Sequence, residues 1–297
     1  MLFFPQFLVR STSSAPSSAS ARSFWGSGRL FWSIVLGLGL TGGNNALVAP
    51  GFAQAPAPSS TPPIAPVPPV VVIPDTLRSA LQSLDQSAGQ ENLDLVLQHY
   101  STNFQDGDGL NRSDLGSVLE KFWKRYDQLS YQTQVISATS TPEGWQLDTV
   151  ITIEGTELNQ SRSLRLKSEI HAIQTWNNNQ LVRQDIVTER NVVTTGQEPP
   201  TLTMNLPAEV QVNERFNLDV ILNEPLEEDL VVGAIVDEPI TIDGFLSPER
   251  PEFEPLLSGG MFKIGRAPAQ PDNRWISAVV IRKGGMTSVT QRLRIIK

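Results

Sequence analysis

The stretch Leu93–Tyr126, LDLVLQHYSTNFQDGDGLNRSDLGSVLEKFWKRY, decides the fold that the sequence predicts. Apolar residues recur every three or four positions over Leu93–Tyr100 and again over Leu115–Tyr126, which predicts two amphipathic helices. Between them Phe104–Gly109, FQDGDG, combines Asp with Gly and predicts a tight turn between antiparallel helices. An earlier apolar stripe predicts a further helix over about residues 74–87.

The spacing of this Asp-Gly loop argues against a calcium site. Counting from Asp106, an EF-hand loop needs Gly at the sixth position and Glu at the twelfth, where this chain has Asn111 and Ser117. The chain has no cysteine and only two histidines, His99 and His171. Disulfides, thiol catalysis and metal sites built from thiolates or several histidines are therefore excluded. We predict no metal and no cofactor.

The hydrophobic period changes from 3.6 to 2 after Tyr126, which predicts β-strands. The predicted strands are 129–140, 145–154, 161–176 and 181–193, with a loop around 155–160. Helices followed by a curved antiparallel sheet that closes over them predict an α+β arrangement.

In this layout residues 75–195 resemble the nuclear-transport-factor-two-like superfamily, in its SnoaL-like branch. Four features carry the resemblance: the Leu93–Tyr100 helix, Phe104 with its Asp-Gly loop, the Leu115–Tyr126 helix and the Trp176–Val187 hairpin. The resemblance implies a cone with an enclosed pocket. It also implies a function among isomerases, dehydratases, cyclases, transport factors and binding modules.

Side-chain alternation along the helices and strands assigns residues to the interior of this cone. The polar residues that point inward are Tyr100, Gln174 and Gln184, and aromatic residues form the walls. The predicted ligand-binding residues are Tyr100, Phe104, Trp123, Tyr126, Gln174, Trp176 and Gln184. This set predicts a neutral pocket for a small apolar ligand. The alternative is that all seven are core residues with satisfied polar tips.

The sequence predicts no catalytic residue inside the cone. His99 lies off the apolar stripe of its helix, and His171 and Asp185 alternate onto charged strand faces. General acid or base catalysis requires an ionisable group within hydrogen-bonding distance of the substrate. A binding role is therefore favoured over an enzyme.

The remainder of the chain, residues 201–297, predicts an all-β domain after a hinge at Gln197–Pro200. Seven short strands separated by Pro-, Gly- and Asn-containing turns are typical of an antiparallel β-sandwich. This part resembles immunoglobulin-like domains, without their Cys…Trp…Cys signature. The Pro-rich segment Pro239–Leu257 is expected to be a long loop or an edge strand.

Charge is unevenly distributed along the chain. Residues 1–74 contain three arginines and no acid, which leaves 20 basic against 31 acidic residues, a net charge of −11, in the rest. Such an acidic protein is not a general nucleic-acid binder. Basic residues gather near the C-terminus, and the predicted partner-binding residues are Arg282, Lys283, Arg292 and Arg294. They would contact an anionic extracytoplasmic partner; the alternative is an ordinary solvated surface.

The first 74 residues predict export. Leu30–Leu40 is an apolar run of signal-peptide length behind Arg22 and Arg29, and Ala53–Ala55 is a small-x-small cleavage pattern. We therefore expect a signal peptide over 1–55, with an uncleaved membrane anchor as the alternative. Residues 56–74 are dense in Pro and predict an extended linker, with a disordered remnant of the leader as the alternative. The expected location is the periplasm, a thylakoid lumen or the secreted fraction.

Together these features predict an exported binding or scaffolding protein without catalytic activity. Its cone would hold a small ligand and its sandwich would contact a partner. One alternative is an isomerase, dehydratase or cyclase acting in the cone. Another is a cell-surface adhesion or wall-interaction protein.

Overall fold

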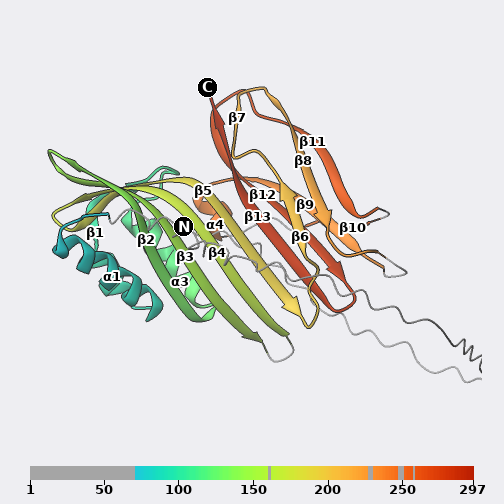
Figure 1. The fold of residues 1–297 in the computed structure, drawn as a ribbon, viewed down its shortest axis with the longest axis horizontal. Coiled ribbons are helices and arrows are strands. Elements are labelled where there is room, and N and C mark those ends of the chain that lie inside the picture. Colours follow the sequence, from blue (N-terminus) through green and yellow to red (C-terminus); the bar gives the residue numbers. More distant parts are fainter. Residues whose placement is uncertain (1–70, 160–161, 227–229, 247–250, 257) are drawn as a thin grey trace, which may run out of the picture. The chain divides into compact units, whose positions relative to one another are not determined.

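The structure is a computed structural model that describes residues 71–159, 162–226, 230–246, 251–256 and 258–297 (Figure 1). The predicted signal peptide and all of the predicted linker before residue 71 lie outside these ranges. The described residues belong to one compact unit. Among their helices, none is long and apolar enough to cross a membrane.

Three helices lie at the start of the described chain. Helix α1 (Asp75–Gly89) occupies the predicted position, buries the predicted apolar stripe and packs on the first long strand. Helix α2 (Leu93–Gln98) has six residues. Helix α3 (Arg112–Trp123) begins after Asn111, whose side chain accepts hydrogen bonds from backbone N–H groups in a capping box completed by Asp114.

The segment between α2 and α3 was predicted to be the end of a helix followed by a tight turn, and the structure differs. Residues Tyr100–Asp106 form strand β1, so Tyr100 lies on a strand and not on a helix. The physical reason lies in strand β5 (Gln180–Gly196), which meets the C-terminal part of the chain only from Arg190 onward. The backbone groups along the earlier edge of β5 would otherwise be unpaired, and β1 pairs with them in parallel.

The four predicted strands of the first part are present; three are longer than expected, and the third has the predicted length, shifted by one residue. They are β2 (Asp127–Thr141), β3 (Gly144–Asn159), β4 (Arg162–Asn177) and β5, paired antiparallel in that order. The predicted loop over 155–160 is mostly strand. Register shifts within the β2–β3 and β4–β5 pairs mark bulges, which bend strands. The helices cover one face of this sheet (Figure 1), which confirms the α+β arrangement.

The second part contains short strands in two groups. They are β6 (Leu202–Asn205), β7 (Glu209–Gln211), β8 (Arg215–Leu222), β9 (Val232–Pro239), β10 (Glu254–Pro255), β11 (Gly260–Arg266), β12 (Asp272–Arg282) and β13 (Gly285–Ile296). Strands β11, β8 and β6 form a three-stranded sheet. The others extend the sheet of the first part, because β13 pairs with β5 from Arg190 to Gly196. The long sheet runs in the order β10-β9-β12-β13-β5-β4-β3-β2.

Two layers therefore face each other in the second part, but one of them is shared with the first part. Apolar residues of β8, such as Leu218 and Val220, share a core with Val289 and Leu293 of β13. An immunoglobulin-like sandwich is not confirmed. The hinge predicted at Gln197–Pro200 follows the end of β5, and the long sheet continues past it. A separate domain on each side stays a prediction.

The segment Pro239–Leu257 contains both a helix and an edge strand. Helix α4 (Ile242–Leu246) follows β9, and β10 pairs with β9 at the edge of the sheet. Phe245 of α4 packs edge-on against Trp275 of β12, with ring centroids 4.5 Å apart. The two belong to a small apolar cluster that also includes Leu110, from the loop after β1. This cluster joins the two parts of the chain.

Candidate binding cavity

A cavity of about 90 Å³ lies between the helices and the sheet of the first part. Side chains from α1, α2, α3 and strands β1 to β5 line it. Its walls are mostly apolar and include Phe104, Phe122, Ile151 and Ile153. The cone predicted from the sequence is thus not filled by its own side chains.

Two buried glutamines on neighbouring strands face each other at this cavity. Nε2 of Gln174 donates to Oε1 of Gln184 at 2.9 Å, and Oε1 of Gln174 accepts from Nε1 of Trp176 at 3.0 Å. These two bonds fix which way each amide points. Nε2 of Gln184 donates to no residue that the structure describes, so one donor of this chain is left for a ligand.

Asp85 of α1 brings a carboxyl group to the cavity. Its Oδ2 accepts the backbone N–H of Thr133 at 2.7 Å, and its Oδ1 accepts the Thr133 hydroxyl at 2.7 Å. Burial raises the pKa of Asp85, and the two hydrogen bonds from Thr133 only partly offset this. The carboxyl is held by neutral donors only.

Asp106, the last residue of β1, brings a second carboxyl group. Its Oδ1 accepts the backbone N–H groups of Asp108 at 3.0 Å and Leu110 at 2.8 Å, which closes the loop 106–110. Its Oδ2 is buried and has no hydrogen-bond partner among the described residues. Burial, together with the charge of Asp108, raises the pKa of Asp106 to about 6 in spite of the two N–H groups.

Two tyrosines complete the polar lining. Tyr131 accepts a hydrogen bond on its hydroxyl from Nε1 of Trp123 at 3.0 Å. Tyr100 packs edge-on against Phe104, with ring centroids 4.8 Å apart. Burial raises the pKa of both tyrosines, so both hydroxyls are neutral at physiological pH.

The structure brings together four of the seven predicted ligand-binding residues. Those that line the cavity are Tyr100, Phe104, Gln174 and Gln184. The other three, Trp123, Tyr126 and Trp176, are not among the lining residues. Trp123 and Trp176 instead support lining residues through their indole N–H groups, and Tyr126 packs against Phe122. These three residues were predicted to line the pocket; in the structure they contact the lining residues from outside the cavity.

The sequence analysis missed the two carboxyl groups. Asp85 follows Leu81 by four positions, so it extends the buried stripe of α1, but an acid at the end of a stripe reads as solvated. Asp106 follows Phe104 by two positions and shares its buried side of β1. Because β1 was expected to be a helix end and a turn, this alternation could not be used.

Neither histidine lines the cavity. His171 pairs with the Asp148 carboxylate on the outer side of the sheet, and Nε2 of His99 lies 3.1 Å from the hydroxyl of Ser83. Asp185 forms an exposed ion pair with Arg183. Within the described ranges, no three His, Cys, Asp or Glu side chains are placed to hold a metal ion.

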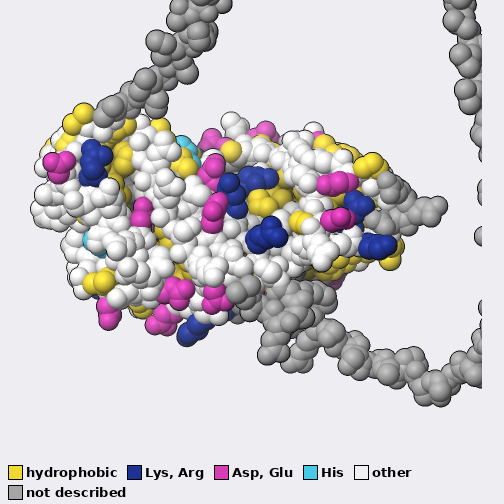
Figure 2. Space-filling model, turned by 60° about the horizontal axis from the view of Figure 1, so that its bottom comes forward, with side chains coloured by type: hydrophobic (Ala, Val, Ile, Leu, Met, Phe, Trp, Pro, Cys, Tyr) yellow, Lys and Arg dark blue, Asp and Glu magenta, His cyan; other side chains and the backbone are white. Residues whose placement is uncertain are grey.

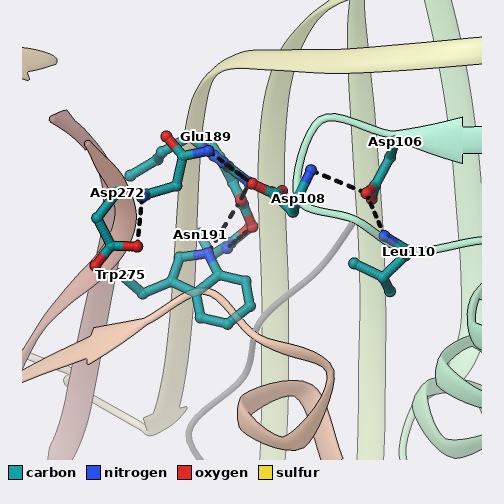
Figure 3. A network of polar contacts seen from close by, with 9 residues as sticks. Asp106, Asp108, Leu110, Glu189, Asn191, Asp272 and Trp275 are labelled. Atoms are coloured by element: carbon teal, nitrogen blue, oxygen red, sulfur yellow. Dashed lines mark hydrogen bonds and ion pairs between the residues drawn. The ribbon is translucent and has the colours of Figure 1, made fainter. Parts of the chain in front are cut away.

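A buried ionic network, here called the junction, lies where β13 meets β5 (Figure 3). Nη1 and Nη2 of Arg292 donate to Oδ1 and Oδ2 of Asp108 at 2.8 and 2.7 Å, and Nη2 also donates to Oε2 of Glu189 at 3.3 Å. Trp275 donates its indole N–H to Glu189 at 3.1 Å, and Asn273 donates to Asp108 at 2.9 Å. The three charged side chains are at most 2% exposed.

Partners inside the junction stabilise the ionised form of Asp108. Burial alone would raise its pKa, but the hydrogen bonds and charge of Arg292, with the Asn273 amide, outweigh burial. The pKa of Asp108 therefore lies below its ordinary value. The Asp-Gly loop is thus no plain turn, because it contributes Asp106 to the cavity and Asp108 to the junction.

The predicted partner-binding residues do not form one basic surface. Arg292 is buried, and both its carboxylate partners belong to this chain, so its assignment to an exposed face is corrected. Arg294 pairs with Glu209 at 3.1 Å. Arg282 and Lys283 lie at the opposite end of the β12–β13 hairpin, nine residues or about 30 Å from the residue that pairs with Arg294.

On the face that Figure 2 shows, basic and acidic side chains are interspersed over the second part. The sequence predicted one basic surface because these residues lie close together in number. In the fold they lie at both ends and on both faces of the long β12–β13 hairpin.

Comparisons with known proteins bear on both parts. Residues 197–296 match a family described as a domain of unknown function, DUF8623. No curated protein matches the sequence. The matched range covers about a third of the chain, and its description assigns no activity.

Similar solved structures include a putative polyketide cyclase from Xanthomonas campestris pv. campestris, with 13% identity, a TM-score of 0.29, and coverage of 38% of this chain and 89% of that one. An LEH-like epoxide hydrolase from M. tuberculosis has 7% identity, a TM-score of 0.27, and coverage of 38% of this chain and 81% of that one. An NTF-2-like protein of unknown function from Burkholderia xenovorans LB400 has 14% identity, a TM-score of 0.24, and coverage of 38% and 81%. TM-scores this low carry no argument about the function of this chain.

Proposed function

We propose that the first part binds a small, mostly apolar molecule in the cavity, as the binding module of an exported protein. The observation that supports this is the cavity itself, about 90 Å³ of space with apolar walls and a few convergent polar groups. An apolar cavity of roughly 150 Å³ is large enough for benzene. The cavity here is smaller, so a ligand smaller than benzene is the size class that fits.

Polar recognition would come from Gln184. Its amide is oriented by Gln174, and its Nε2 has no partner among the described residues. This N–H donor suits a hydroxyl or carbonyl oxygen on the ligand. A ligand that filled the apolar space without meeting this donor would leave it unsatisfied.

The test is a titration of the full chain with small alcohols, ketones and amines, followed by NMR of isoleucine methyl groups. Ile151, Ile153 and Ile170 line the cavity, so a ligand inside it shifts their signals. Gln184→Leu is expected to weaken binding of oxygen-containing ligands. The matched control is Gln132→Leu, an exposed residue of β2. Equal effects of both substitutions, or no binding of any probe, would contradict the proposal.

A second candidate function is favoured by one observation. Asp106 lines the cavity with a pKa raised to about 6 by burial, and a carboxyl of this kind can exchange protons near neutral pH. This observation supports the alternative of an isomerase, dehydratase or cyclase. The inward residues predicted from the sequence, Tyr100, Gln174 and Gln184, gave that alternative no support. Product analysis by mass spectrometry separates the two functions. Conversion of a bound compound that is abolished by Asp106→Asn, with binding retained, would favour the enzyme.

Location outside the cytoplasm is proposed from the sequence of the leader alone. N-terminal sequencing of protein isolated from cells is expected to give a terminus near Pro56. Protein that begins at Met1 in a soluble cytoplasmic fraction would contradict export.

Contact of the second part with an anionic partner remains proposed for Arg282 and Lys283. Binding through these residues should weaken steeply between low salt and half-molar salt. Reversal of both charges should abolish it. A cell-surface adhesion role would require the second part alone to retain binding to cells or wall material.

A further inference from the structure

The two carboxyl groups at the cavity lack a cationic partner within the described chain. Asp85 is held by the backbone and hydroxyl of Thr133, and Asp106 by backbone N–H groups on one oxygen only. Oδ2 of Asp106 is buried without a hydrogen bond, and the residue as a whole is 4% exposed. Buried carboxylates are normally paired with a cation.

Arg183 and Arg292 form their ion pairs with other carboxylates, although the charge of Arg183 also acts on Asp106 at longer range. Arg183 lies on β5 beside Gln184, which is in register with Asp106, but its guanidinium forms two hydrogen bonds with Asp185 on the exposed side of the strand. Arg292 donates to Asp108 and Glu189 in the junction. Among the described residues, Asp85 and Asp106 take part in no ion pair.

The aromatic lining adds a second attraction for positive charge. Tyr100, Phe104, Phe122 and Tyr131 all line the same cavity as the two carboxyls. The negative face of an aromatic ring attracts a cation, and more strongly where water is excluded. Aliphatic side chains fill the rest of the wall, so the cation must also carry apolar groups.

We infer that the cavity binds a small organic ammonium ion, with its N–H group donated to Oδ2 of Asp106 and its alkyl groups against the aromatic and aliphatic walls. This inference rests on the proposed function and names its ligand class. Asp85 adds a second carboxyl group to the cavity, and Gln184 contacts the neutral end of the ligand. Two carboxyls in an apolar space suit an alkylammonium ion better than a metal ion, which needs six or more oxygen ligands when it is calcium.

The test compares two compounds of equal size on the full chain, isobutylamine and isobutanol. At pH 7.5 the amine is protonated and Asp106, with a pKa of about 6, is ionised. The affinity of each compound is read from the methyl signals of Ile151 and Ile170. We expect the amine to bind at least about tenfold more tightly, as a hydrogen bond between charged groups implies.

Asp106→Asn should remove this preference and leave the affinity for isobutanol within about twofold, because the amide keeps an oxygen for the loop but loses the charge. A thermal melt shows whether the variant is folded. If it is not, the wild-type protein supplies the second measurement, which is the amine affinity at pH 7.5 and pH 5.

Acid should weaken binding of the amine but not of the alcohol. The charged groups around Asp106 are Asp108 in the loop, Asp85 on α1 across the cavity and Arg183 on β5, which stays a cation throughout, while Tyr100 and Tyr131 stay neutral. Protonation of Asp106 below a pKa of about 6 removes the charge that holds the amine. Asp85 titrates in the same direction.

The outcomes separate the inference from the function on which it rests. Equal or tighter binding of isobutanol would overturn the ammonium ligand and leave the binding function intact. Failure of both compounds would overturn both. Stabilisation by calcium chloride alone, without any effect of the amine, would replace the ammonium ion by a metal ion and overturn the inference.

Discussion

Two pairs of carboxyl groups have opposite electrostatic surroundings in this fold, although one member of each pair, Asp106 and Asp108, lies in the same loop. In the junction, Asp108 and Glu189 share the guanidinium of Arg292. At the cavity, Asp85 and Asp106 receive only neutral donors. Burial acts to raise the pKa of both Asp108 and Asp106, yet the pKa of Asp108 is lowered and that of Asp106 is raised to about 6.

The difference teaches that burial alone does not reveal what a carboxyl group does. A carboxylate with its cation inside the chain is part of the architecture, and here it fixes β13 against β5 and the loop 106–110. A carboxyl without one leaves a position for a charge from outside. Substitutions in the junction and at the cavity test this difference.

Arg292→Met is expected to have the largest effect, a loss of about 3–5 kcal/mol in the free energy of unfolding, because Asp108 and Glu189 remain buried without their cation. Urea unfolding at pH 7 measures this. The matched control is Arg294→Met, two residues along the same strand, with a side chain 35% exposed. Its loss should stay below about 1 kcal/mol.

A triple variant sharpens this prediction. Replacing Arg292, Asp108 and Glu189 together by apolar residues of similar size should recover much of the loss, because no unpaired charge remains. Equal losses for Arg292→Met and Arg294→Met would show that the junction contributes nothing beyond an exposed ion pair.

The pH dependence of Asp106 should produce the next effect. Its pKa is 3.8 in the unfolded chain and about 6 in the fold, so the folded state binds the proton more tightly and wild-type stability falls as pH rises from about 4 to 7. Asp106→Asn removes this fall. Relative to wild type, the variant should gain up to roughly 3 kcal/mol over this window. Parallel pH profiles for the two proteins would contradict the raised pKa.

Asp108→Asn should show the opposite sign at neutral pH. It replaces two charged hydrogen bonds from Arg292 by weaker contacts and should lower stability by about 1.5–3 kcal/mol. The pKa of Asp108 is lowered, so its contribution is present above pH 3.8 and is lost as pH falls through the folded value. The difference from wild type, measured by urea unfolding, should therefore shrink in acid.

The smallest effect is expected at the exposed pair of Arg183 with Asp185, whose side chains are 50% and 43% exposed. Arg183→Gln should change stability by less than about 1 kcal/mol, and high salt should remove the difference. Amine binding in the cavity should be unchanged. A fall in amine affinity would indicate that Arg183 takes part in the site.

Local patterns were sufficient to predict most elements of the first part. The stripe of α1, the cap at Asn111 and the alternation along β4 and β5 each depend on residues close in sequence. The α+β arrangement followed from their order. The inward placement of Gln174 and Gln184 followed from alternation alone, because a strand's side chains point to its two faces in turn.

Long-range pairing could not be predicted in the same way. Nothing near Tyr100 shows that the edge of β5 is open to β1, and nothing near Gly285 shows that β13 pairs with β5. Both errors about charge follow from this gap. Unless β1 is known to be a strand, alternation cannot place Asp106 on its buried side. Unless β13 is known to pair with β5, the buried ion pairs of Arg292 cannot be predicted.

The loop 106–110 ties the two sets of carboxyls together mechanically. Asp106 and Asp108 are two residues apart, and Oδ1 of Asp106 holds the backbone N–H of Asp108. A ligand that moves Asp106 therefore acts on Asp108, which forms the ion pair with Arg292. Energetic linkage between binding sites is reciprocal, so if ligand binding in the cavity changes the affinity of β13 for a partner, that partner changes the affinity of the cavity by the same factor.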